Sequence, residues 1–193
     1  LIQKHCLEDC FVLGFIGSFF KFEGIDLLVT LMKDLKNIPI KMLLVGEGET
    51  FGYIRKKIEQ HDLNDRVILA GRVPHESINE YYSIIDVLIY PRYSERITEL
   101  TTPLKPIEAM AMRKNIVISD VGGLKELVPN GCGEIFTAGD VNDLKKKIMI
   151  LIGDKGLRKE MVENAFIFAE SRDWIQVARR YINIYEKIAG NNL

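Results

Sequence analysis

The sequence predicts an α/β protein built on a doubly wound parallel sheet. Short apolar runs that end in glycine or proline alternate along the chain with longer segments whose apolar residues recur at helical spacing. The segment 24–36 is typical, because its apolar residues fall on one helical face. Strands that alternate with helices in this way form a parallel sheet. With 193 residues, the chain is long enough for one hydrophobic core.

Several apolar runs have the length and composition of buried strands. They are residues 11–17, 40–46, 67–71, 86–90, 116–119 and 133–136. Because parallel strands are joined by right-handed crossovers, the intervening segments are expected to cover both faces of one sheet. We therefore predict a Rossmann-like, doubly wound sheet of about six strands.

The segments between and after these strands have the apolar periodicity of helices. They are residues 24–36, 51–61, 75–84, 105–112, 141–152, 155–170 and 174–189. The last three follow one another with short breaks and form C-terminal helices. In a doubly wound fold, ligands bind beyond the carboxyl ends of the strands. The residues that directly follow each strand are therefore the candidates for a functional site.

The composition of the chain indicates which kinds of binding partner and cellular location to expect. The chain carries 26 basic and 27 acidic residues, for a formal net charge of -1, so no long-range field favours nucleic acid. Its three cysteines, Cys6, Cys10 and Cys132, lack the spacing of a disulfide framework, which favours a cytoplasmic location. No set of residues completes a four-ligand metal site, so no bound metal is predicted.

The loop after the first predicted strand contains Gly17, Ser18 and Lys21. Small residues let a phosphate approach the backbone, and the helix that follows presents a positive amino end. Lys21 would add a positive charge. An ordinary strand-to-helix turn with a solvated lysine is the alternative, and the segment alone leaves both open.

Gly71, Arg72 and Val73 follow the third predicted strand. Their free backbone groups and the flat guanidinium suit the edge or face of a nucleobase, although an exposed arginine in a turn is the simpler reading. A dinucleotide cofactor is not predicted, because the glycine-rich turn at 46–50 lacks the third glycine of that fingerprint.

The segment 104–112 is the most informative stretch. Glu108 lies in the first turn of a short apolar helix, where its carboxylate can accept hydrogen bonds from ribose hydroxyls, and Lys105 is placed to meet phosphate. The alternative is that Glu108 only caps the helix and Lys105 is solvated. Gly122 and Gly123, after the fifth strand, permit backbone amides to face an anion, but a plain turn is equally compatible.

The order of these motifs is similar to that of a known family. The matching stretches are Gly17-Ser18, Glu23-Gly24-Ile25-Asp26-Leu27-Leu28, Leu43-Leu44-Val45-Gly46-Glu47-Gly48, Val67-Ile68-Leu69-Ala70-Gly71-Arg72-Val73-Pro74, Tyr81-Tyr82, Asp86-Val87, Tyr90-Pro91, Pro106-Ile107-Glu108-Ala109-Met110-Ala111, Ile116-Val117-Ile118-Ser119 and Gly122-Gly123-Leu124-Lys125-Glu126-Leu127-Val128. Together they resemble the carboxyl-terminal domain of family-four, group 1 glycosyltransferases, which is one half of the GT-B architecture.

The resemblance implies a function and a set of roles. Members of the family transfer a sugar from a nucleotide diphosphate sugar to an acceptor, with retention at the anomeric carbon and without a bound metal or other cofactor. By resemblance, Glu108 holds the ribose, residues 71–73 line the base pocket, and Gly17, Ser18 and Lys105 border the diphosphate. Glu108 and Lys105 are the residues predicted to take part in catalysis. The preceding Thr102, Pro103 and Leu104 are predicted to contribute to donor binding.

Three positions differ from the family pattern. Leu100 stands where the family commonly has the first glutamate of a pair, with Glu99 one position away. Ser18 and Glu23 stand where the family commonly has an arginine and a lysine. Lys21 and Lys105 are expected to supply the phosphate cations instead.

The resemblance also implies a domain division and partners. Residues 1–10 are expected to be a lead-in, 11–173 the nucleotide-sugar-binding domain, and 174–193 a C-terminal helix and tail that packs on an N-terminal domain. That further domain would bind the acceptor, a sugar or a lipid-linked sugar, so the chain alone is expected to transfer poorly. The full-length protein is expected in the cytoplasm, with peripheral membrane association where the acceptor is lipid-linked. The alternatives are a non-catalytic binding module and a GT-B nucleotide-sugar epimerase.

Overall fold

The predicted parallel sheet is present. The computed structural model describes residues 1–190 and contains a sheet of six strands in the order β3-β2-β1-β4-β5-β6, with every neighbouring pair parallel. The strands are β1 (Phe11–Ile16), β2 (Ile40–Val45), β3 (Val67–Gly71), β4 (Val87–Tyr90), β5 (Asn115–Ser119) and β6 (Glu134–Phe136). The order reverses between β1 and β4, and in such a sheet the crevice for ligands opens at that reversal.

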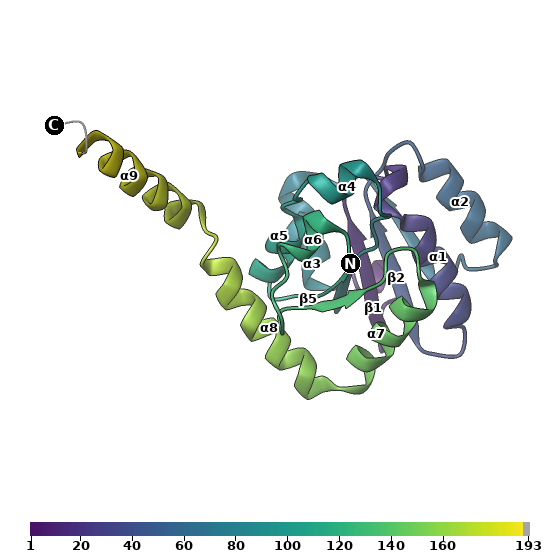
Figure 1. The fold of residues 1–193 in the computed structure, drawn as a ribbon. Coiled ribbons are helices and arrows are strands. Elements are labelled where there is room, and N and C mark those ends of the chain that lie inside the picture. Colours follow the sequence, from purple (N-terminus) through teal and green to yellow (C-terminus); the bar gives the residue numbers. More distant parts are fainter. Residues whose placement is uncertain (191–193) are drawn as a thin grey trace.

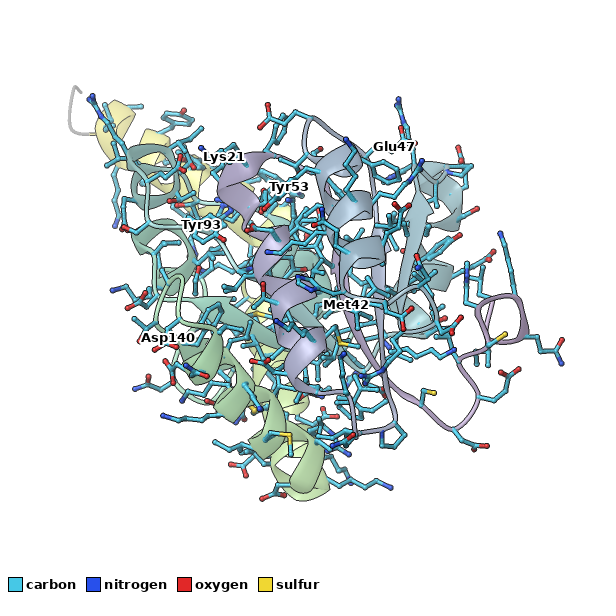
Figure 2. The ribbon with its side chains drawn as sticks, turned by 90° about the vertical axis from the view of Figure 1, so that its right-hand side faces the viewer. Lys21, Met42, Glu47, Tyr53, Tyr93 and Asp140 are labelled. Atoms are coloured by element: carbon cyan, nitrogen blue, oxygen red, sulfur yellow. The ribbon has the colours of Figure 1, made fainter. Side chains whose placement is uncertain are left out.

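Helices cover both faces of the sheet (Figure 1). On one face lie α1 (Ile25–Asp34), α2 (Phe51–Gln60) and α7 (Val141–Gly153). On the other lie α3 (Ile78–Ser83), α5 (Lys105–Ala111) and α8 (Lys155–Glu170). Because both faces are covered, most strand residues are apolar, and Met42, labelled in Figure 2, is fully buried.

Two short helices were not predicted. They are α4 (Arg96–Leu100) and α6 (Gly122–Lys125), each too short to show helical periodicity. A reciprocal cap holds α4, since the Glu95 side chain accepts from the backbone of Thr98 and the Thr98 side chain accepts from that of Glu95. Gly122 and Gly123, for which the sequence left an anion-binding turn and a plain turn open, form the first turn of α6.

The segment predicted as one helix over 75–84 is divided. It begins with a 3-10 turn at His75–Ser77 and continues as α3. Further 3-10 turns lie at Gln3–His5 and Lys21–Glu23. These single turns contain too few residues for a periodic pattern, so they could not be predicted.

The last helix, α9 (Trp174–Gly190), differs from the others because none of its residues is buried. Figure 1 shows it extending away from the body of the molecule beyond α8. Its large apolar side chains are exposed, among them Trp174 at 74% and Tyr185 at 65%. Residues 191–193, the end of the predicted tail, lie outside the described part of the chain. Across residues 1–190, none of the helices has both the length and the apolar character that crossing a membrane requires.

Candidate functional site

The carboxyl ends of β1, β2 and β3 lie side by side and are joined by backbone hydrogen bonds. The amide of Gly17 donates to Val45 at 2.9 Å, and the amide of Gly46 donates to Gly71 at 2.9 Å. The approach is so close that a Cβ on Gly46 would lie 1.8 Å from the Gly17 carbonyl oxygen. Glycine at position 46 is therefore required for the three strand ends to meet.

Two adjoining pockets open at these strand ends, and both are lined by Ile16, Gly17 and Ile78. We call the two together the Gly17 groove. The first pocket has a volume of about 510 Å³ and also contains Ser18, Val45, Gly46, Glu47, Gly48, Arg72 and Val73. The second has a volume of about 450 Å³ and also contains His75, Asn79, Tyr82, Lys105, Glu108, Ala111 and Met112. The structure thus brings predicted site residues from three separate strand ends into one groove.

Lys105 is held at the floor of this groove by a buried carboxylate. Its Nζ lies 2.7 Å from Oε1 of Glu23 and 5.0 Å from the centre of the Phe15 ring. Burial lowers the pKa of Lys105, and the charge of Glu23 opposes that shift. A Cβ on Gly17 would lie 2.6 Å from this ammonium, so Lys105 packs directly on the glycine turn.

Glu23 makes a second ion pair, with Arg92. Nη2 of Arg92 lies 3.0 Å from Oε1 of Glu23, and Nε lies 3.3 Å from Oε2. The side chains of Glu23 and Arg92 are only 4% and 8% exposed, whereas that of Lys105 is 24% exposed. Sequence reasoning identified Glu23 only as a departure from a family pattern and gave Arg92 no role, because pairing between residues so far apart in sequence leaves no periodic signal.

Glu108 lies on α5 and is exposed to the groove. Beside it is the buried side chain of Tyr82, whose pKa is raised by burial and by the charge of Glu108. The hydroxyl of Tyr90 donates a hydrogen bond of 3.0 Å to the carbonyl of Lys105, which fixes the start of α5 against β4. Sequence reasoning assigned neither tyrosine a role, although Tyr82 stands on the helix that follows β3, where functional residues were expected.

The three residues before α5 lie at the margin of the groove. The hydroxyl of Thr102 lies 3.3 Å from a carboxylate oxygen of Glu126. Leu104 is 58% exposed and shares with Glu108 a separate apolar pocket of about 260 Å³. That pocket is also lined by Ile107, Leu127, Arg172, Trp174 and Val177. Thr102, Pro103 and Leu104 therefore do not line the Gly17 groove itself, and only Leu104 meets Glu108 in a pocket.

Lys21 is not brought into the Gly17 groove. It lines a different pocket of about 310 Å³, together with Asp26, Tyr53 and Tyr93. Figure 2 shows Lys21, Tyr53 and Tyr93 close together near the start of α1. Among the predicted phosphate cations, only Lys105 therefore lies where the other site residues gather.

The predicted anion turn at Gly122 already has a partner within the protein. Its amide donates to Oε2 of Glu99 at 2.7 Å, and the hydroxyl of Ser94 donates to Oε1 of Glu99 at 2.7 Å. These hydrogen bonds lower the pKa of Glu99. A Cβ on Gly123 would lie 2.0 Å from the carbonyl oxygen of Thr101, so this glycine serves close packing of α6 against the loop after α4.

Comparison with known proteins identifies what this arrangement resembles. The family described as "Glycosyl transferases group 1" matches residues 2–167. An uncharacterized glycosyltransferase of Methanocaldococcus jannaschii is 28% identical over 176 residues, which are 91% of this chain and 48% of that protein. The phosphatidylinositol N-acetylglucosaminyltransferase GPI3 subunit of Saccharomyces cerevisiae is 27% identical over 190 residues, which are 96% of this chain and 40% of that protein.

A solved structure extends the likeness to the fold. The crystal structure of HepE from Anabaena in complex with UDP matches with a TM-score of 0.82 and 22% identity, over 98% of this chain and 51% of that one. This match confirms the predicted likeness to one half of a GT-B architecture. The chain spans about half the length of the proteins it matches, or less, since it covers 48% and 40% of the two relatives and 51% of the solved structure.

Proposed function

The chain belongs to the group 1 glycosyl transferases, and from that premise we propose that the Gly17 groove binds the nucleotide diphosphate sugar donor. The observation that carries the proposal is the meeting of three chemically distinct groups in one groove. Arg72 and Val73 come from the end of β3, and Lys105 and Glu108 come from α5 after β4. A nucleotide offers a matching series of base, ribose and phosphate.

Each group has a role that its chemistry supports. The backbone of Gly71 to Val73 and the Arg72 guanidinium meet the base, because both can bond to its edge. The exposed carboxylate of Glu108 accepts hydrogen bonds from the ribose hydroxyls, and charge-assisted bonds of this kind are the stronger ones. Gly17 and Ser18 border the diphosphate beside the Lys105 ammonium. The sugar then extends along the groove towards solvent.

For the chemical step, we propose retention at the anomeric carbon without a bound metal. Negative charge grows on the diphosphate as it leaves, and a preorganised cation beside that oxygen stabilises the transition state. We assign this role to Lys105, and the packing of its Nζ on Gly17 in the groove supports the assignment. Glu108 contributes by fixing the donor in the productive position. Transfer that persists in the presence of a strong chelator is the expected behaviour.

We further propose that transfer requires an N-terminal domain that binds the acceptor. Two observations support this part of the proposal: the chain covers 48% of its M. jannaschii relative, and α9 presents a long apolar face to solvent. A sugar or a lipid-linked sugar is the proposed acceptor, and the yeast relative's name specifies phosphatidylinositol. A lipid-linked acceptor would bring the full-length protein from the cytoplasm to a membrane surface. The isolated chain is then expected to bind donor and to transfer poorly.

Calorimetric titration of the chain with UDP, GDP and ADP tests the donor proposal. One diphosphate is expected to bind in preference to the other two, and its nucleotide sugars are expected to compete for the same site. UDP is the leading candidate, because HepE was crystallised with UDP. If folded protein binds none of the three, the groove is not a donor site. The non-catalytic module and the epimerase gain no support from the family assignment.

A further inference from the structure

Three charged side chains meet at the Gly17 groove, which Lys105 lines, and each comes from a different segment. Glu23 lies in the loop after β1, Arg92 follows β4, and Lys105 begins α5. Glu23 accepts from Arg92 through both carboxylate oxygens, at 3.0 and 3.3 Å, and from Lys105 Nζ at 2.7 Å. We refer to Glu23, Arg92 and Lys105 as the charged triad.

Arg92 is fixed independently of Lys105. Its guanidinium also lies 3.5 Å from the carbonyl of Thr101 and 5.7 Å from the centre of the Phe22 ring. It therefore compensates the buried charge of Glu23 even if Lys105 moves. The charged triad as a whole keeps one net positive charge, which sits on its most exposed member, Lys105.

Lys105 on its own would be poorly suited to hold a phosphate. A largely buried ammonium loses its hydration, which favours the neutral amine, and the nearby Arg92 cation favours it further. Glu23 opposes both effects, because an adjacent carboxylate stabilises the ammonium, and the charge of Glu108 adds a smaller effect in the same direction. Its hydrogen bond also takes only one of the three ammonium protons, so the others remain available to a ligand in the groove.

Glu23 also fixes the direction of a flexible side chain. The four-carbon stem of a lysine has many rotamers, and holding one of them costs conformational entropy. The contact with Glu23 and the 5.0 Å approach to the Phe15 ring hold Nζ against Gly17. A cation that is already placed binds a phosphate without paying for its own ordering.

We propose that Glu23 is a positioning residue that, with Arg92, holds Lys105 charged and aimed at the diphosphate of the donor. This inference rests on the proposed donor function. It accounts for a carboxylate at a position where the family pattern commonly has a lysine, because the carboxylate here recruits the cation from α5. Glu23 itself does not touch the donor.

The variant Glu23→Gln tests the proposal by titration with the preferred nucleoside diphosphate and with its nucleoside. Affinity for the diphosphate is expected to fall about tenfold or more, as when a charge-assisted contact is lost. Affinity for the nucleoside is expected to stay unchanged, because no phosphate is present. Unchanged or tighter diphosphate binding would show that Glu23 only sequesters Lys105, and would overturn the inference.

A pH series separates positioning from general structural damage. Without Glu23 the pKa of Lys105 falls further, so diphosphate affinity in Glu23→Gln should decline at a lower pH than in the unaltered chain. The nucleoside curves should coincide. In a Lys105→Met background, Glu23→Gln should cause no further loss of diphosphate affinity, since Glu23 acts only through Lys105. An additive loss, or coincident diphosphate pH curves, would contradict the proposal.

Controls keep the test decisive if Glu23→Gln folds poorly. The double variant Glu23→Gln with Arg92→Met removes both charges of the most buried pair, so the Arg92 guanidinium is not left inside without a partner. The same diphosphate loss is expected from it. The matched control, Glu134→Gln on β6, breaks the 2.9 Å pair with Lys147 of α7 and should change neither affinity. If the unaltered chain binds no diphosphate, the donor proposal fails as well; if only the Glu23 variants behave differently from expectation, this inference alone fails.

Discussion

At the scale of single residues, the site depends on the balance of forces on Lys105. Burial lowers its pKa, while Glu23, 2.7 Å away, raises it. Together these effects keep the Lys105 ammonium in a partly buried position, where its attraction for phosphate is stronger than in water. This balance makes the site sensitive to pH.

We predict that affinity for the diphosphate is lost as the pH rises, and that the loss occurs at a lower pH than it would if Lys105 had the pKa of an ordinary lysine. The ammonium binds phosphate and the neutral amine does not, so affinity is full below the lowered pKa of Lys105 and is lost as the pH rises through it. The nucleoside carries the same base, so the ratio of the two affinities isolates the lysine. In Lys105→Met, the affinity for the diphosphate relative to the nucleoside should be lower and should not change as the pH rises into the alkaline range. If this relative affinity still falls with pH in the variant, a group other than Lys105 causes the pH dependence.

At the scale of elements, glycines decide how closely the strand ends meet. Gly46 has φ of +136°, and a Cβ there would lie 1.8 Å from the Gly17 carbonyl oxygen. The Gly17 turn has little room to move away from a Cβ at position 46, because the Lys105 side chain also packs against Gly17. The shape of the groove therefore depends on position 46.

We expect Gly46→Ala to lower the free energy of unfolding by roughly 1–3 kcal/mol, the usual range for a strained backbone position. It should also weaken diphosphate binding, since the strand ends must separate. The matched control is Gly52→Ala in α2, where an added Cβ meets nothing within 4 Å. That change should stabilise the protein by about 0.5–1 kcal/mol, because alanine favours helix. Chemical denaturation measures both, and equal stability of the two variants would refute the packing argument.

The elements also show what the sequence can and cannot predict. The apolar runs predicted all six strands, because a strand covered on both faces is mostly apolar. The parallel topology brings the strand ends to one edge of the sheet, and Lys105 and Glu108, both predicted as site residues, line one groove there. Lys21 was predicted for the same site, but it lines a different pocket, with Tyr53 and Tyr93. The Arg92–Glu23 pair depends on side-chain packing between distant segments, which no local pattern encodes.

At the scale of the whole molecule, α9 is the α-helix of the described chain with no buried residue. Its side chains include Trp174, Ile175, Tyr181, Ile182, Ile184 and Tyr185, all at least half exposed, from 50% to 74%. An apolar surface of this kind is typical of an interface. An N-terminal domain is the partner that we propose for it.

We predict that the chain self-associates through α9 as its concentration rises. Ile182→Lys should reduce this association, because the charge lies within the apolar face. Asn183→Lys adds the same charge at the neighbouring polar position and should leave the association unchanged. Sedimentation velocity of the three proteins measures the effect. A strictly monomeric unaltered chain would show that the exposed face of α9 does not drive self-association.

The most direct test of the donor site is whether Glu108 contacts the ribose. The preferred nucleoside diphosphate and its 2′,3′-dideoxy analogue are titrated into the unaltered chain and into Glu108→Ala, with Glu160→Ala on α8 as an exposed carboxylate control. In the unaltered chain and the control, removing the hydroxyls should cost about 1–3 kcal/mol of binding free energy. In Glu108→Ala the two ligands should bind equally. If that variant still loses as much affinity when the hydroxyls are removed, Glu108 does not hold the ribose and the proposed donor orientation is wrong.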